Sequence, residues 1–231
     1  MYIRDSVRQF IECHIDLIES NNFYDLYYNC PDYPTDSYKG ELADVLYASG
    51  INPFLHMNHI PNNCFYGSET VKELTLPSSI TYIGSCAFAY ANIEKIIINK
   101  ECKMLNDNAF EDAYHLKEIF FPSDSALERI SEECFGACVS LKSITLPDSI
   151  KYIESRAFSK TSSLEYFSLG KNLGLQSEVF SNSNLTELHF RGSKVDWLKG
   201  KKSSSCLTYS HIEDIICTDG TLNLQELLNG N

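Results

Sequence analysis

Apolar residues recur with a period of 22 to 25 residues through the central part of the chain. A phenylalanine marks each period, and successive phenylalanines are separated by 23, 22, 25, 23 and 22 residues. The six marker positions are Phe65, Phe88, Phe110, Phe135, Phe158 and Phe180. Two further apolar columns lie five and eight residues before each marker, and only the last copy breaks the second column, at Asn172. Several matching columns in six copies indicate a repeat that sets the whole architecture.

A short motif of the form apolar-x-x-apolar-x-apolar follows each marker phenylalanine. Its last four residues alternate between apolar and variable positions, which is the period of a half-buried strand. We therefore expect the fourth and sixth residues of the motif to be buried and the third and fifth to face outward. Proline directly after the motif, at positions 77, 122 and 147, ends the strand without removing a hydrogen-bond donor from its interior. Each unit has one apolar face too small to bury alone, so stacked units are expected to form a solenoid with a parallel sheet along one side.

Two segments carry a resemblance to a known family. LTLPSSITYIGSCAF (74–88) and SLKSITLPDSIKYIESRAF (140–158) resemble the BspA-like leucine-rich repeats. Gly192-Ser193-Lys194 with Trp197, followed by ICTDG (216–220), is similar to the closing segment of such arrays. The resemblance covers residues 57–222 and implies a leucine-rich-repeat solenoid of the α+β class, with a parallel sheet on one side and short turns or helices on the other. It also implies a binding or adhesion surface, because the fold serves unrelated partners.

The two ends of the chain lack the repeat. Apolar residues at helical spacing, from Val7 to Ile18, predict an amphipathic helix, with further short helices over 23–30 and 42–46. A final strand is expected near 212–217. We therefore expect a helical N-terminal cap at 1–56, six repeats at 57–193 and a C-terminal cap at 194–231, since the open ends of a solenoid core must be shielded.

Charge narrows the class of partner. The chain of 231 residues has 31 acidic and 19 basic residues, a formal net charge of −12. This balance argues against direct contact with nucleic-acid phosphates or with an anionic membrane surface. It favours a protein partner, and in particular a basic one. The N-terminal cap is the most acidic part, with nine acids and three bases in residues 1–56.

Targeting signals and cysteine usage bear on the compartment. Charged residues interrupt every apolar run in the first twenty positions, and no stretch of about 18 apolar residues occurs. A cytoplasmic protein is therefore expected. The nine cysteines form no Cys-x-x-Cys pair, so we expect free, packed thiols rather than disulfides or a zinc site.

No catalytic motif is present in the sequence. It has no G-x-S-x-G, no glycine-rich phosphate loop and no HExxH, so we expect no enzyme, no catalytic residues and no cofactor. His56, His59 and Cys64 lie close in sequence but lack a fourth ligand, so no metal site is expected. Acidic pairs such as Glu111-Asp112 and Glu132-Glu133 are expected to be solvated turn residues.

The outward positions of the predicted strands define the candidate binding surface. Neighbouring strands lie about 4.8 Å apart, so Ile97 and Phe120, both fifth residues of the motif, should lie side by side. Two large apolar residues on an open sheet with acids beside them resemble an interface core with a polar rim. The expected partner-binding residues on this face are Ile97, Phe120, Tyr166, Glu73, Glu118, Glu187 and His189. The acidic cap offers a second contact, through Asp25, Asp32 and Asp36.

These observations predict a non-enzymatic protein–protein interaction module. Two alternatives stay open at this point. One is an acidic, phage-encoded inhibitor of a basic bacterial nucleic-acid enzyme, such as a CRISPR-type defence nuclease. The other is a bacterial surface adhesin. The sequence sets neither the identity of the partner nor the oligomeric state.

Overall fold

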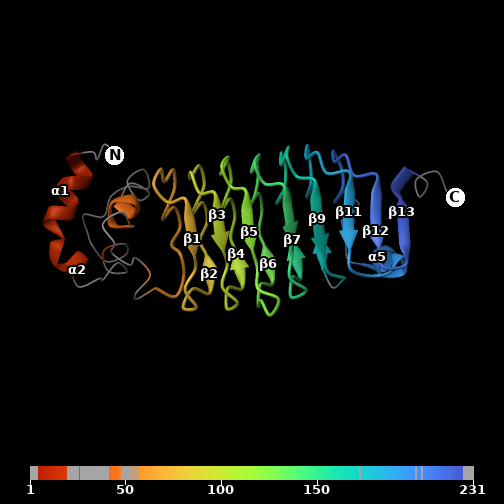
Figure 1. Cartoon of the computed structure of the whole chain (residues 1–231), viewed down its shortest axis with the longest axis horizontal. Helices are drawn as coiled ribbons and strands as arrows, with labels where there is room; N and C mark the ends of the chain where they lie inside the picture. Colours follow the sequence, from red (N-terminus) through yellow and green to blue (C-terminus); the bar gives the residue numbers. More distant parts are fainter. Residues whose placement is uncertain are drawn as a thin grey trace.

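The chain winds into an elongated coil with short helices at its start (Figure 1). The computed structural model describes residues 5–19, 26, 42–47, 54, 57–171, 173–200, 202–203 and 205–225. Helices α1 (Asp5–Cys13) and α2 (Ile15–Glu19) come first, and residues 42–47 are also helical. Most of the helix expected over 23–30, together with Asp25, Asp32 and Asp36, lies outside the described residues.

Each coil of the solenoid contributes one longer and one shorter strand. The longer strands are β1 (Glu73–Thr75), β3 (Lys95–Ile97), β5 (Glu118–Phe120), β7 (Ser143–Thr145), β9 (Tyr166–Leu169) and β11 (Glu187–Phe190). The two-residue strands are β2 (Tyr82–Ile83), β4 (Met104–Leu105), β6 (Arg129–Ile130), β8 (Tyr152–Ile153) and β10 (Gly174–Leu175). The expected solenoid and its outward and inward strand positions therefore appear in the structure.

The strands assemble into three sheets. The short strands form one parallel sheet in the order β10-β8-β6-β4-β2. The longer strands form β1-β3-β5 and a second sheet, β7-β9-β11-β12-β13. The strand expected near 212–217 is β12 (Asp214–Cys217), which pairs parallel to β11. Helix α5 (Lys194–Lys199) precedes β12, and β13 (Gly220–Asn223) then closes the edge in antiparallel pairing with β12, which the sequence pattern did not predict.

The part of each coil that carries neither strand is a series of tight turns around the marker phenylalanine. The residues two before and two after each phenylalanine adopt positive φ, as Glu133 (φ 50) and Ala137 (φ 55) do around Phe135. Such a conformation costs a non-glycine residue on the order of 1 kcal/mol. Backbone hydrogen bonds between coils offset this cost, for example from Phe88 N–H to Ala109 O at 2.7 Å. The turns therefore form a second ladder that keeps successive coils in register.

The phenylalanines stack along the centre of the solenoid. All six are fully buried. Ring centroids of successive residues from Phe65 to Phe158 lie 5.1 to 5.2 Å apart, with interplanar angles of 3 to 10°. The expected burial and stacking of Phe88, Phe110, Phe135 and Phe158 are thus confirmed.

A buried carboxylate joins the helical residues 42–47 to the first coil. Asp44 accepts hydrogen bonds from the Ser68 hydroxyl, from the Thr70 hydroxyl at 2.8 Å and from the Glu69 backbone N–H at 2.9 Å. Leu42 and Leu46 from the same helical turn are buried in the common core. This contact fixes where the segment before the repeats meets the solenoid.

Three side chains depart from the sequence-based expectation. Ile15 was assigned to the apolar helix face but is 44% exposed, because the expected single helix is divided at His14 into α1 and α2. Phe121, a sixth-position residue, is only half-buried. Ser168, a fifth-position residue expected to face solvent, is 3% exposed because the Arg191 guanidinium covers it and donates to its hydroxyl at 2.7 Å.

Candidate binding surfaces

The sheet face places Ile97 next to Phe120, as the repeat alignment predicts. The two residues are Cα partners in the β3–β5 register. The Phe120 side chain is 48% exposed, whereas Ile97 is half-buried. The anchor of this surface is therefore one large aromatic ring on β5, with Ile97 as its neighbour.

Charged side chains surround the Phe120 ring. The Lys95 ammonium lies 5.2 Å from the ring centroid and 3.3 Å from the Glu118 carboxylate. Glu73 is the register partner of Lys95 on β1 and is exposed. Exposed ion pairs contribute little to stability. These groups are therefore available to exchange their partners for those of another molecule.

A cleft opens beside Phe120, where the two sheets of longer strands separate. Within the described residues β5 and β7 form no backbone pairing, although all other successive longer strands do. The cleft has a volume of about 220 Å³ and is lined by Phe120 and Phe121 on one side and by Ser143 and Thr145 on the other. The sequence pattern did not predict this break between β5 and β7. The feature that could have predicted it is the 25-residue gap from Phe110 to Phe135, whose extra residues fall within 122–126, shortly after β5.

The second group on this face lies on β9 and β11. The Tyr166 side chain is 41% exposed, and its ring lies 4.5 Å from the His189 ring. The His189 Nε2 atom is 4.0 Å from the Glu187 carboxylate. Strand β7, with exposed Ser143 and Thr145, separates this group from Phe120. The expected residues thus form two aromatic positions on one face, with small polar side chains between them.

The histidines considered for a metal site are only partly described. His56 lies outside the described residues. The His59 ring stacks on Tyr82 at 4.5 Å, its Nδ1 lies 2.8 Å from the Asn58 side-chain oxygen, and burial lowers its pKa. Cys64 is buried. In the part of the chain that the structure describes, no three His, Cys, Asp or Glu side chains are grouped as metal ligands.

Lys202 packs against Trp197 of α5 rather than extending into solvent. Its ammonium lies 4.5 Å from the centroid of the Trp197 ring and donates to the Trp197 carbonyl. Burial lowers the pKa of Lys202. Lys199 lines a neighbouring cleft of about 350 Å³ together with Lys151 and Lys171, which makes this hollow basic.

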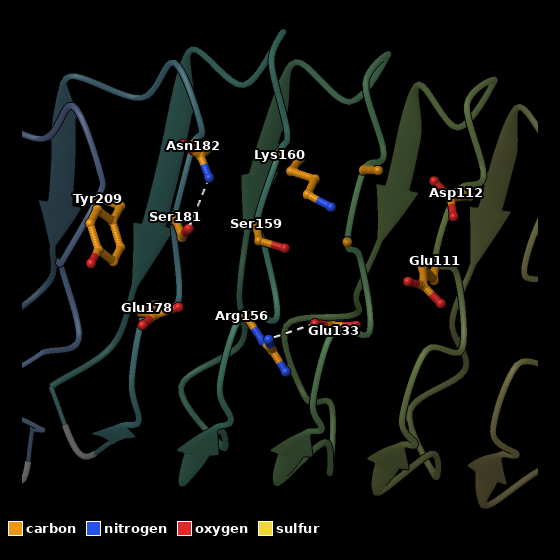
Figure 2. Close-up of a pocket in the computed structure, with 12 residues that line it drawn as sticks. Glu111, Asp112, Glu133, Arg156, Ser159, Lys160, Glu178, Ser181, Asn182 and Tyr209 are labelled. Atoms are coloured by element: carbon orange, nitrogen blue, oxygen red, sulfur yellow. Dashed lines mark hydrogen bonds and ion pairs between the residues drawn. The ribbon is translucent and has the colours of Figure 1, made fainter.

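The turn side of the solenoid holds a polar groove of about 410 Å³ (Figure 2). The groove crosses successive coils, from Glu111 and Asp112 at one end to Tyr209 at the other. Gly136 and Ala137 occupy its middle, where the neighbouring coils that line the groove carry larger side chains in the same two columns. The sequence pattern predicts Glu111 and Asp112 as solvated turn residues and does not predict a groove.

Charges in this groove are unevenly compensated. Arg156 pairs with Glu133 at 2.8 Å and with Glu132 at 2.7 Å. Asn108 donates to the Glu111 carboxylate at 2.8 Å. Burial, and then the neighbouring charges of Asp112 and Glu133, raise the pKa of Glu111. The acidic end of the groove is therefore an environment that a cation would stabilise.

Among the helices that the structure describes, none is both long enough and apolar enough to cross a bilayer.

Comparisons with known proteins agree with the observed solenoid fold. The family profile described as "BspA type Leucine rich repeat region" matches residues 51–135 and 116–226. A leucine rich cell surface protein from Faecalibacterium prausnitzii is similar in structure, with a TM-score of 0.56 and 21% identity, over 71% of this chain and 43% of that chain. A leucine-rich repeat protein from Bacteroides ovatus aligns with a TM-score of 0.45 and 21% identity, over 69% of this chain and 59% of that one.

One curated relative matches part of the chain. It is the BDNF/NT-3 growth factors receptor of Gallus gallus, which is 29% identical over 114 residues. The match covers 46% of this chain and 14% of the receptor. The chain thus spans less than half the length of this receptor and of the Faecalibacterium protein.

Proposed function

Because this chain belongs to the BspA type leucine-rich repeat family, we propose that it is a non-enzymatic module that binds a protein partner through the outward face of its longer strands. The exposed Phe120 ring at the rim of the β5–β7 cleft is the observation that carries this proposal. The family and the solenoid fold are typical of proteins that bind rather than catalyse.

The composition of this face fits an interface. Binding energy in protein interfaces concentrates on a few large side chains, often aromatic, that fill pockets and are surrounded by polar groups. Phe120 and Tyr166 supply the two aromatic positions. Glu118, Glu187 and His189 lie beside them and supply the polar rim. Ser143 and Thr145 between the two rings leave room for a partner side chain to reach the cleft.

Charge favours a basic partner. The net charge of −12 would steer a basic protein toward the chain, and this attraction weakens as salt screens it. An acidic inhibitor of a basic nucleic-acid enzyme is therefore the second candidate function. In that setting the acidic cap residues Asp25, Asp32 and Asp36 would add to the contact. A surface adhesin would rely on the aromatic positions and show a weaker dependence on salt.

A photo-crosslinking experiment tests the proposal. The phenylalanine analogue p-benzoylphenylalanine would replace Phe120, and the tagged chain would be irradiated in the cells that produce it. We expect a defined protein to be crosslinked and identified by mass spectrometry. The matched control carries the same analogue at Val195, which is 52% exposed and lies on α5 away from this face. Equal crosslinking of one protein from both positions, or of none from position 120, would contradict the proposal.

A further inference from the structure

The groove on the turn side has the dimensions of a short extended peptide. Its coils follow the phenylalanine stack, in which the steps from Phe110 to Phe135 and from Phe135 to Phe158 are each 5.1 Å. Asp112 and Lys160 occupy the same column two coils apart, so their backbones are separated by roughly 10 Å. An extended chain rises about 3.3 Å per residue and covers that span in about three residues.

The two ends of this span differ in charge. Glu111 and Asp112 form the acidic end, and no cation lies within ion-pair distance of Glu111 among the described residues. Lys160 forms the basic end, and none of the ion pairs found between described residues includes it. Figure 2 shows Lys160 apart from the two acids, and the coil that carries Gly136 and Ala137 comes between their coils in the sequence. A ligand with one charge of each sign would satisfy both ends.

The groove continues beyond Lys160. Ser159 and Ser181 form its floor there, Asn182 donates to the Ser181 hydroxyl at 3.2 Å, and the 69% exposed Tyr209 ring ends it. Hydroxyl and amide groups of this kind can donate to or accept from a peptide backbone. A single amino acid would fill only the part between the charged ends, whereas a peptide would use the whole length.

We propose that this groove is a second binding site, which takes an extended peptide segment carrying a basic side chain and, two or three residues away, an acidic one. The basic side chain pairs with Glu111 and Asp112, and the acidic side chain pairs with Lys160. The site is separate from the strand face that carries Phe120, because its residues belong to the turns around the phenylalanine column. It therefore gives the chain two partner-binding sides.

Comparison of equivalent positions in the repeat suggests a variant that should block the groove. Tyr90 and Tyr209 occupy the same column as Ala137, each with φ of 59° against 55° for Ala137. The backbone of this column thus accepts a tyrosine, and Ala137→Tyr fills the middle of the groove without requiring a new backbone conformation. Val195→Tyr, at an exposed position of α5, is the matched control because it adds the same side chain outside both proposed binding surfaces.

The test is a phage-displayed heptapeptide library selected in parallel on the full-length wild type, on Ala137→Tyr and on Val195→Tyr. We expect the wild type and Val195→Tyr to enrich peptides with a Lys or Arg and an Asp or Glu two or three positions apart, and Ala137→Tyr to enrich none of them. Enrichment of the same peptides by Ala137→Tyr, or no enrichment of peptides with this charge pair by the wild type, would overturn the proposal.

A charge reversal provides an independent measurement. Lys160→Glu places an acid in the column where Asp112 already holds one at positive φ. By fluorescence anisotropy, we expect the dissociation constant of an enriched peptide to rise at least tenfold. A version of that peptide with its acidic residue replaced by Lys should then regain binding to the variant. Unchanged affinity of the original peptide for a folded Lys160→Glu protein would contradict the assignment. Neither result depends on the strand face, so this site and the proposed function fail or succeed separately.

Discussion

The ring centroids of Phe158 and Phe180 lie 6.0 Å apart, farther than any earlier pair in the phenylalanine stack. Phe167 accounts for the difference. Its ring lies 4.8 Å from each of the two and meets both edge-on, at 77° and 83°. Edge-to-face contact is a favoured aromatic geometry, so the stack changes its packing mode here without losing contact.

Removing one ring from the regular part of the stack should destabilise the protein strongly. Phe135→Ala is expected to lower the free energy of unfolding by about 3–5 kcal/mol, because it opens a cavity between two stacked neighbours. Phe120→Ala is the matched control, and we expect it to change the unfolding free energy by less than about 0.5 kcal/mol, since its ring is exposed. Urea denaturation of both variants measures the difference. Similar losses for the two would contradict the assignment of core and surface.

The buried cysteine thiols should react only when the protein unfolds. Burial raises the pKa of Cys102 to about 12 and raises that of Cys138, whose Sγ also donates to the Phe110 carbonyl at 3.1 Å. Both thiols are therefore protonated and shielded near neutral pH. We expect a thiol reagent to modify Cys13 rapidly in the native protein, and all nine cysteines after denaturation without reductant. A reductant-sensitive melting temperature would argue for a disulfide instead.

The repeat made the architecture predictable from the sequence. Each coil places its phenylalanine, its strand motif and its small residues at fixed offsets, so inside and outside follow from the alignment alone. The neighbours Ile97 and Phe120 follow in the same way, because parallel strands of equal register align equal motif positions. The features missed arise between coils. The β5–β7 break depends on how the structure accommodates a longer loop, and the burial of Ser168 depends on Arg191 from the next coil.

The sequence predicts the turn-side groove only when the geometry of the turns is already known. Gly136 and Ala137 are the smallest pair in the two columns after the phenylalanines. Small residues in adjacent columns leave a hollow only if those columns share one surface. The positive φ values before and after each phenylalanine create that surface. The residue types at these positions do not consistently predict a positive φ, since Glu, Arg, Lys and Tyr all occur there.

The contact between Tyr90 and Asp112 should shift the pKa of the Tyr90 hydroxyl. Asp112 accepts a hydrogen bond from the Tyr90 hydroxyl, and this bond with the Asp112 charge raises the pKa of Tyr90 to about 12. Because the folded-state pKa exceeds the ordinary value of about 10, the contact stabilises the fold below pH 10 and is lost as the pH rises toward 12. We expect Asp112→Asn to return the pKa of Tyr90 toward 10 in a titration of the tyrosine ring carbons by NMR. A Tyr90 pKa that does not respond to Asp112→Asn would rule this contact out.

Loss of the Asp44 carboxylate should destabilise the structure locally rather than along the whole chain. Replacing it with alanine leaves the buried Ser68 hydroxyl without its acceptor, which costs about 1–3 kcal/mol. In hydrogen–deuterium exchange we expect faster exchange at residues 42–47 and 68–70, with unchanged protection at the coil of Phe135 and Phe158. This outcome would fit a cap at residues 1–56 that docks on a solenoid able to stand without it. Uniform acceleration along the whole chain would instead make the cap part of one cooperative unit.

We propose that the strand face around Phe120 and Tyr166 binds the partner. The most direct test is a calorimetric titration of the crosslinked and identified partner with wild type, with the double variant Phe120→Ala/Tyr166→Ala, and with the control Tyr152→Ala/Val195→Ala, whose side chains are similarly exposed elsewhere. We expect at least a hundredfold loss of affinity for the first variant, wild-type affinity for the control, and melting temperatures within about 2 °C of the wild type for both. Wild-type affinity of the Phe120→Ala/Tyr166→Ala variant would contradict this proposal.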